Sequence, residues 1–281
     1  MSSADIRPAC PEDKAAILAF CQNTFNWGDY IADAWDRWME DANGKIFVGL
    51  INTQPVAMVH VALLEKGVVW MEGMRVHPDF RRHRVGTAID AAGRAFARER
   101  GHPIARLATS IHNIPAQKAL EVQGYTRIAQ FDEWVALPSD AGASPVAVAS
   151  SDDVPALLAL WNSSDISAAT RSLLPDQWRW TELTAERLAR HVDARQVRIV
   201  TGGFGLFSTH DDENEPEFLV QALAGDEQAL GALAAAARAE AGYRGFARIE
   251  ALVAHHPRLS RVLEGSGYTC ESGMLIYEQT S

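Results

Sequence analysis

The residues best suited to chemistry lie in the stretch Val76–Thr87, whose sequence is VHPDFRRHRVGT. Four consecutive members carry basic or ionisable side chains: Arg81, Arg82, His83 and Arg84. Guanidinium groups bind phosphate oxygens through paired hydrogen bonds. Gly86 lets a ligand approach the backbone closely, and Thr87 adds a hydroxyl donor. This composition predicts a pyrophosphate site; the alternative is a solvated basic turn.

Two elements must position this stretch. The apolar run Val68–Val76 predicts a strand before the basic residues. The periodicity of Val85–Arg100 predicts a helix after them, closed by Gly101 and Pro103. The first turn of a helix presents unpaired N–H groups and partial positive charge, which favour a bound phosphate. Strand, basic loop and helix together therefore indicate an anion site.

The surrounding elements alternate between helical and extended patterns. Helices are expected at Asp13–Phe25, Tyr30–Asp41 and Pro115–Gln123, strands at Lys45–Ile51, Pro55–Leu64 and Ile104–Ser110, and closing strands within Arg127–Leu137. The predicted fold class is α/β (α+β), with a mixed, mostly antiparallel sheet and helices on both faces.

The chain also repeats itself. The pattern of residues 9–20 recurs at 149–160, and that of residues 120–126 recurs at 263–269. Two matches at nearly the same offset predict a tandem repeat of one domain. A run of small residues separates the copies. The predicted organisation is a catalytic domain at 1–138, a linker at 139–145 and a second domain at 146–281.

Two motifs carry a family resemblance. Val76-x-Pro78-x-x-Arg81-x-x-x-x-Gly86-Thr87 resembles the acetyl-CoA signature of the GCN5-related N-acetyltransferase (GNAT) superfamily. A second signature follows in the family's order: the strand Ile104–Ser110, then Asn113-x-x-Ala116, then Gly124-Tyr125. The match covers most of residues 5–137 and implies two tandem GNAT-like domains.

The resemblance implies that acetyl-CoA is the co-substrate, that no metal is needed, and that acetyl passes directly to an amine in a ternary complex. It assigns coenzyme contacts to Met74, Arg75, Val76, Arg81, Arg82, His83, Arg84, Val85, Gly86, Thr87, Asn113 and Ala116. The strands near Met74–Val76 are expected to splay and free backbone N–H groups. For Asn113, a helix cap is the alternative interpretation.

Glu72 is the candidate general base. Period-two alternation places it on the same strand face as Met74 and Val76. A carboxylate in a partly buried cleft can acquire the raised pKa that proton abstraction needs. The alternative is a strand-edge glutamate that holds structure or binds substrate.

The acceptor is expected to enter over the first two helices. Trp27, Asp29 and Tyr30 combine aromatic faces with one carboxylate, a set that suits an amine. Trp35 and Trp38 are better explained as helix core. The segment 72–78 is also similar to a GNAT branch that acts on amino acids such as histidine.

The sequence departs from the family pattern at two positions. Arg84 stands where the loop usually has its first glycine. Leu120 stands where a tyrosine often protonates the departing thiolate. Either another donor serves, or the thiolate leaves unassisted, since a thiol of pKa about 8.5 is a fair leaving group.

The second copy lacks the basic loop. Its strand Glu217–Leu223 leads almost directly into a helix that begins with Asp226 and Glu227. Acidic residues there complement the helix dipole and repel pyrophosphate. His255 or His256 takes the place of Asn113; ligand binding and an exposed loop pair are the two readings. We expect no acetyl-CoA in this copy, which would cover the first domain, complete the acceptor pocket or mediate homodimer contacts.

Composition limits the class of protein. The net charge of −10 disfavours general nucleic-acid binding. The three cysteines form no CxxC pair, and no membrane span or secretory signal is visible. These features predict a cytoplasmic protein that binds neither nucleic acid nor membrane.

Three functions follow from these features. The first is N-acetylation of the primary amine of a small molecule. The second is acetylation of a protein lysine or N-terminus. The third is non-catalytic sensing of acetyl-CoA, suggested by Arg84 and Leu120. A covered aromatic pocket favours the first, and an open peptide groove the second.

Overall fold

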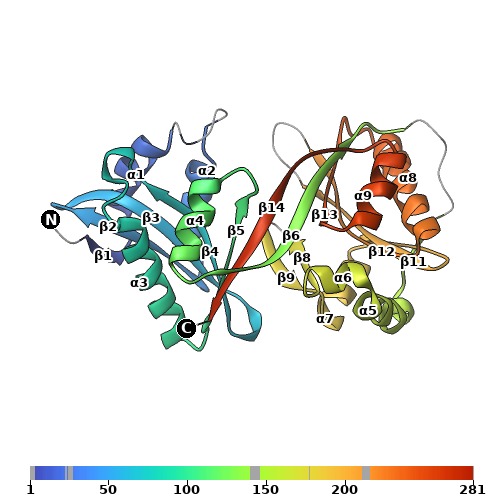
Figure 1. The fold of residues 1–281 in the computed structure, drawn as a ribbon, viewed down its shortest axis with the longest axis horizontal. Helices are drawn as coiled ribbons and strands as arrows, with labels where there is room; N and C mark the ends of the chain where they lie inside the picture. Colours follow the sequence, from blue (N-terminus) through green and yellow to red (C-terminus); the bar gives the residue numbers. More distant parts are fainter. Residues whose placement is uncertain are drawn as a thin grey trace. The chain divides into compact units, whose positions relative to one another are not determined.

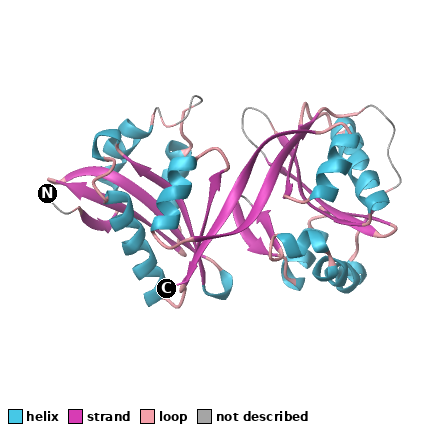
Figure 2. Cartoon of the chain, in the orientation of Figure 1, coloured by secondary structure: helices cyan, strands magenta, loops and turns pink. Residues whose placement is uncertain are grey.

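The computed structural model describes residues 4–22, 24, 28–139, 146–176, 178–210 and 216–280. The chain folds into two units. Unit 1 comprises Met1–Ala108, Lys118–Thr126 and Tyr277–Ser281, and unit 2 comprises Thr109–Gln117 and Arg127–Ile276. Figure 2 shows strands and helices alternating in both units. The two units are described separately below.

Unit 1 is built on a sheet whose strand order is β1-β2-β3-β4-β5-β14. The strands are β1 (Asp5–Pro8), β2 (Gly44–Ile51), β3 (Gln54–Leu63), β4 (Val68–Val76), β5 (Ile104–Ser110) and the end of β14 (Thr269–Thr280). The β1–β4 pairs are antiparallel, and β4 pairs with β5 in parallel. The predicted β4 and β5 agree with the structure residue for residue.

Helices cover the unit 1 sheet. They are α1 (Lys14–Cys21), α2 (Ile31–Met39), α3 (Val85–Glu99) and α4 (Ile114–Val122), the last of which begins in unit 2. The helices α1 and α2 bury Ile17, Trp35 and Trp38 against one side of β2 and β3, which confirms both tryptophans as core. The helix α3 packs against β2, β3 and β4.

Unit 2 repeats this plan with the strand order β6-β13-β12-β11-β10-β7. Its strands are β6 (Thr126–Ala136), β7 (Ala147–Val148), β10 (Val197–Val200), β11 (Gly203–His210), β12 (Glu217–Gly225) and β13 (Ile249–Ala254), with a separate hairpin of β8 (Leu173–Asp176) and β9 (Arg179–Glu182). Within the described ladders of unit 2, β12 and β13 form the parallel pair, as β4 and β5 do in unit 1.

The helices of unit 2 form two groups. They are α5 (Val154–Ser163), α6 (Asp165–Ala169), α7 (Ala185–Asp193), α8 (Glu227–Tyr243) and α9 (Pro257–Gly265). One core gathers α5 and α7 against Phe204 and Ala222, and the other gathers α8 and α9 against Phe218 and Ala251. The two cores mark the two faces of the sheet. The predicted α/β class with mostly antiparallel sheets is confirmed.

The closing strands are exchanged between the repeats. The expectation that 127–137 closes the sheet of the first repeat is wrong, because β6 pairs with β13 of unit 2, from Phe131↔Ala254 to Ala136↔Ile249. The end of β14 instead lies beside β5 in unit 1 (Figure 1). There Arg106 Nε donates to Glu278 Oε2 at 2.7 Å. Periodicity identifies a closing strand but not its partner.

Candidate active site

The basic loop runs from His77 to Arg84, between β4 and α3. It opens with a 3₁₀ turn, Pro78–Phe80, in which the His77 ring accepts a hydrogen bond from Asp79 N–H at 3.2 Å. Arg82 and Arg84 then adopt left-handed backbone conformations, with φ of 65° and 60°. Left-handed residues can turn backbone N–H groups to one side, as in the backbone nests that bind anions.

The basic side chains of this loop face solvent. Arg81, Arg82, His83 and Arg84 are all exposed. The His83 ring lies 2.9 Å from the Arg81 carbonyl oxygen, which holds the loop closed. The left-handed φ of Arg84 gives a physical reason for the family's preference for glycine there, since glycine adopts this conformation without steric cost.

The N-terminus of α3 is open. Arg84 is its N-cap residue, and among the described residues no side chain caps the helix there. A Cβ atom on Gly86 would meet Val76 Cγ2 at 3.6 Å and no other described atom within 4 Å. Val85 is buried, so only its backbone can reach a ligand. The first N–H groups of α3 thus remain available to an anion.

A β-bulge in β4 changes which residues share a face. Met58 pairs with Arg75 and His60 with Glu72, so β4 has one extra residue over this interval. Gly73 takes φ 63°, and a Cβ there would lie 2.6 Å from the Trp38 ring. Because bulges re-aim side chains, simple alternation fails here.

The expected shared face of Glu72 and Val76 is therefore wrong. The Glu72 carboxylate lies on the α2 side, next to His60, which stacks on Trp38. Val76 lies on the α3 side, facing Gly86. The general-base role assigned to Glu72 does not depend on alternation and stays a prediction.

His60 is a site residue that the sequence reasoning missed. Its side chain is 0% exposed, and its Nδ1 lies 2.8 Å from Glu72 Oε1. The imidazole stacks on Trp38 at 4.6 Å between ring centroids and 8° between planes. The Nε2 atom lies 3.6 Å from Asp41 Oδ2. A histidine inside the apolar strand QPVAMVHVAL was the available signal, since a buried polar side chain needs a partner.

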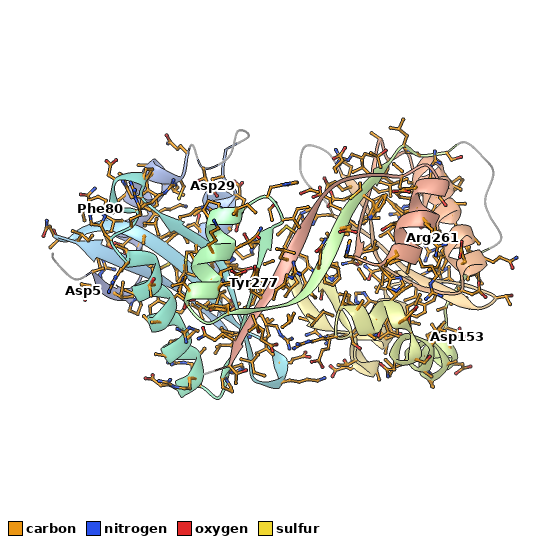
Figure 3. The ribbon with its side chains drawn as sticks, viewed as in Figure 1. Asp5, Asp29, Phe80, Asp153, Arg261 and Tyr277 are labelled. Carbon is orange, nitrogen blue, oxygen red and sulfur yellow. The ribbon has the colours of Figure 1, made fainter. Side chains whose placement is uncertain are left out.

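Arg75 and Asp29 form a buried ion pair. Arg75 Nε donates to Asp29 Oδ2 at 2.7 Å, and Nη2 donates to Oδ1 at 3.0 Å. Figure 3 labels Asp29 just before α2. Burial is the largest influence on the pKa of Asp29 and raises it, but hydrogen bonds from Arg75 and Thr24 outweigh burial, so the pKa is lowered.

Tyr30 lies beside the Arg75–Asp29 pair. The Arg75 guanidinium carbon lies 5.2 Å from the centre of the Tyr30 ring, within cation–π range. Burial raises the pKa of the Tyr30 hydroxyl. Both Asp29 oxygens already accept hydrogen bonds from Arg75, so a cationic acceptor would have to share this pair. Trp27, predicted beside them, lies outside the described residues.

The parallel ladder between β4 and β5 ends before the bulge. Their recorded parallel ladder runs only from Val68↔Ile104 to Trp70↔Arg106, while β4 continues to Val76. Backbone groups of Met74 to Val76 thus extend beyond this ladder, as the predicted splay requires.

The second signature is divided between the units. Asn113 and Ala116 fall in unit 2, where Asn113 Oδ1 accepts the Ala116 N–H at 3.3 Å. This contact fits the helix-cap alternative; the coenzyme role of both residues stays a prediction. In unit 1, the buried Tyr125 hydroxyl donates to Asp90 Oδ1 at 2.8 Å, and burial raises its pKa. Tyr125 therefore stabilises the packing of α3.

The corresponding turn in unit 2 has a different structure. The strand β12 ends at Gly225, and α8 begins at Glu227. Asp226 Oδ1 accepts the Ala229 N–H at 2.8 Å, which caps the helix. A Cβ on Gly225 would lie 2.5 Å from the Gly202 carbonyl oxygen, so protein backbone fills this space.

The histidine pair of unit 2 makes contacts within the protein. His255 Nδ1 lies 2.7 Å from Asp132 Oδ2, and the His256 ring accepts the Arg258 N–H at the start of α9. Across the described parts of the chain, no group of three His, Cys, Asp or Glu residues is placed to hold a metal. No helix within those same parts is long and apolar enough to cross a bilayer.

Residues 14–125 match the model of the acetyltransferase (GNAT) family. Residues 14–125 therefore form a GNAT acetyltransferase domain. The predicted resemblance to this family is confirmed.

Along its whole length, the chain has the fold of solved GNAT structures. It resembles a GCN5-related N-acetyltransferase from Sphaerobacter thermophilus, with TM-score 0.67 and 16% identity over 99% of this chain and 95% of that one. It also resembles a tandem GNAT protein from the clavulanic acid biosynthesis pathway, with TM-score 0.59 and 14% identity over 99% and 98%. No curated protein matches the sequence.

Proposed function

We propose that this protein transfers an acetyl group from acetyl-CoA to the primary amine of a small molecule. The observation that carries the proposal is the open N-terminus of α3 behind a basic loop with two left-handed residues. The N–H groups and the side chains of Arg81, Arg82 and Arg84 suit the phosphates of coenzyme A. Such a site binds a polyanion without a metal.

The reaction requires little covalent work from the protein. The acceptor ammonium loses a proton, and its nitrogen attacks the thioester carbonyl carbon. The C–S bond then breaks, the thiolate gains a proton, and the nitrogen loses a second one. The products are the N-acetylated amine, coenzyme A with a free thiol, and one released proton. Holding the two reactants together supplies much of the rate enhancement.

Glu72 is the proposed base, because its carboxylate is partly buried and lies beside the splayed end of β4. Its side chain is 15% exposed, and His60 fixes one carboxylate oxygen. A positioned base of this kind typically contributes about 10²–10⁴-fold to the rate. N–H groups between Met74 and Val76 are proposed to bind the thioester oxygen.

The acceptor is proposed to approach from the α2 side of β4. Glu72 lies on that side with the Tyr30 ring, and the buried Arg75–Asp29 pair lies close by. An aromatic face and a carboxylate suit an organic cation. The Arg75 guanidinium also suits an acceptor that carries a carboxylate, as an amino acid does.

The decisive experiment measures thiol release from acetyl-CoA across a panel of small amines and amino acids, with a lysine peptide for comparison. We expect turnover with at least one small amine, and loss of turnover in Glu72→Gln with acetyl-CoA affinity unchanged. Equal activity of Glu72→Gln would remove Glu72 as the base. If purified protein does not bind acetyl-CoA, the proposal fails as a whole.

A second candidate is a non-catalytic acetyl-CoA sensor, which one observation favours: Leu120 cannot donate a proton. Tight acetyl-CoA binding without turnover on any amine would support this candidate. Turnover above the buffer rate would exclude it and would show that a tyrosine at position 120 is not required.

A further inference from the structure

A cavity of about 130 Å³ lies within unit 2, between the sheet and the hairpin β8–β9. Alternating residues of two strands form its floor, and the hairpin supplies an aromatic wall. The principal lining side chains are Glu217, Leu219 and Gln221 on β12, Glu250 and Leu252 on β13, and Trp178 beside β9. The volume is close to that of an apolar cavity that holds benzene, about 150 Å³.

Three carboxylates share this face of the sheet. Leu219 pairs with Glu250 across β12–β13, which sets Glu217 diagonally from Glu250. Glu133 pairs with Leu252 across β6–β13 and is therefore also diagonal to Glu250. Diagonal neighbours on one face are about 7–8 Å apart. Three acidic side chains thus surround one small region of the cavity floor.

The carboxylates interact unfavourably. Burial is the largest cause that raises the pKa of Glu250, to about 7, and the charges of Glu133 and Glu217 raise it further. Burial and the charge of Glu271 raise the pKa of Glu133 as well. Arg248 opposes both shifts, but its guanidinium already binds Glu271 at 3.0 Å. A second cation here would relieve the repulsion.

Gln221 provides a second, independent observation at this cavity. Its side chain is only 8% exposed. Its Nε2 donates to the Pro175 carbonyl oxygen at 2.8 Å, which fixes the orientation of the amide. Its Oε1 has no hydrogen-bond partner among the described residues. A buried acceptor left unpaired is costly, and Gln221 lines the cavity, so a ligand bound there can supply the donor.

We propose that the unit 2 cavity binds a small organic ammonium ion, whose N–H groups donate to Glu250 and Gln221 Oε1. An ammonium group carries three donors and no acceptor, which matches a carboxylate and an unpaired amide oxygen. The Trp178 ring and the side chains of Leu219 and Leu252 suit the attached carbon chain. This binding site is separate from the proposed acetyl transfer.

The first test is calorimetric titration of the full chain with n-butylammonium chloride, in the absence of acetyl-CoA. We expect saturable binding, with no saturable signal from 1-butanol or potassium chloride. Equal binding of 1-butanol would show an apolar cavity, and equal binding of potassium would show an inorganic cation site; either result overturns the proposal. No binding of butylammonium overturns it too. The acceptor site proposed in unit 1 also suits an amine, so the titration is repeated with Tyr30→Ala; binding that this variant abolishes belongs to unit 1 and overturns the unit 2 assignment.

Two variants and one matched control locate the site. We expect Glu250→Gln and Gln221→Leu each to weaken butylammonium binding by about tenfold or more. Glu271→Gln removes the same charge from a residue whose charge also acts on Glu250, but Glu271 is already paired with Arg248, so the expected change is below about threefold. Unchanged binding in either Glu250→Gln or Gln221→Leu would overturn the assignment. Thermal melts verify that each variant is folded.

The pH dependence provides a third readout. Butylammonium keeps its charge between pH 6 and 8.5, whereas Glu250 becomes charged over this range. Binding is therefore expected to tighten as the pH rises, with proton release near pH 7 that calorimetry detects in buffers of different ionisation enthalpy. The other ionisable groups lining the cavity are Asp176, His191, His210 and Glu217. Glu250→Gln should abolish the proton release; release that persists in this variant would contradict its assignment to Glu250.

Discussion

The segments that join the central strand to the long helix differ between the two units. In unit 1, residues 77–84 form a basic loop, and α3 begins without a side-chain cap among the described residues. In unit 2, a single residue, Asp226, separates β12 from α8 and caps it. The same helix end is left open to an anion in one unit and closed by the protein's own carboxylate in the other.

The strands on either side of these two segments are alike in the two units. Both central strands have a register shift, and both pair with the next strand in a short parallel ladder. Around its bulge, β4 carries Glu72, whereas β12 has the sequence LVQAL with no carboxylate. Under the proposed function, acetyl-CoA binding and acetyl transfer therefore depend on one loop and one side chain that unit 1 adds to a shared fold.

The largest expected effect tests the side chain of Glu72. Glu72→Gln should lower kcat by about 10²–10⁴-fold, because the amide cannot accept the proton of the acceptor amine. Steady-state thiol release measures kcat, and calorimetry with acetyl-CoA measures affinity, which should not change. His60→Gln is the companion variant; it should shift the pH profile of kcat. If Glu72→Gln also lost affinity for acetyl-CoA, the idea that the loop binds the coenzyme while Glu72 acts only as the base would be contradicted.

The next effect tests the loop. Replacing Arg81, Arg82 and Arg84 together by alanine should weaken acetyl-CoA binding by about 100-fold, since charge-assisted hydrogen bonds to phosphate are lost. The matched control replaces three exposed arginines outside the loop, Arg98, Arg127 and Arg261, and makes the same change in net charge. Similar losses in both triple variants would mean that general electrostatics, and not this loop, binds the coenzyme.

A smaller effect tests the closed end of α8. Asp226→Ala should lower the free energy of unfolding by about 1 kcal/mol, because the Ala229 N–H loses its cap. Asp226→Asn keeps an accepting oxygen and should retain most of the stability. Chemical denaturation measures both. Acetyl-CoA stoichiometry should stay at one per chain in each variant; a second bound molecule in Asp226→Ala would show that the cap alone blocks unit 2.

The smallest expected effect concerns Arg84. Arg84→Gly should stabilise the protein by up to about 1 kcal/mol, because glycine adopts the left-handed conformation without strain. Arg84→Ala keeps the strain and removes the charge. If the side chain contacts phosphate, both variants weaken acetyl-CoA binding by a similar few-fold factor. Lower stability of Arg84→Gly than of Arg84→Ala would contradict the strain argument.

The sequence predicted the elements whose pattern is local. The bounds of β4 and β5 were correct, since apolar runs and turn residues mark both ends. The start of α3 at Val85 and the acidic start of α8 also followed from short-range signals. The burial of Trp35 and Trp38 followed from helical periodicity.

What the sequence did not predict depends on partners far along the chain. The Arg75–Asp29 pair joins residues 46 positions apart. The His60–Glu72 contact depends on a bulge that no local pattern marks except Gly73. The partner of β6 was misassigned because a strand's periodicity records which face is buried and not which neighbour it pairs with.

The exchanged strand also sets an order of events during synthesis. Unit 1 needs Tyr277 to Thr280, yet the rest of it is complete once Thr126 is made. At translation rates of about 5–20 residues per second, the intervening 150 residues take roughly 8–30 s. During that interval β5 has an unpaired edge, which invites contact with another nascent chain. The acetyltransferase domain, although most of it is encoded first, therefore completes its sheet only after unit 2 has been synthesised.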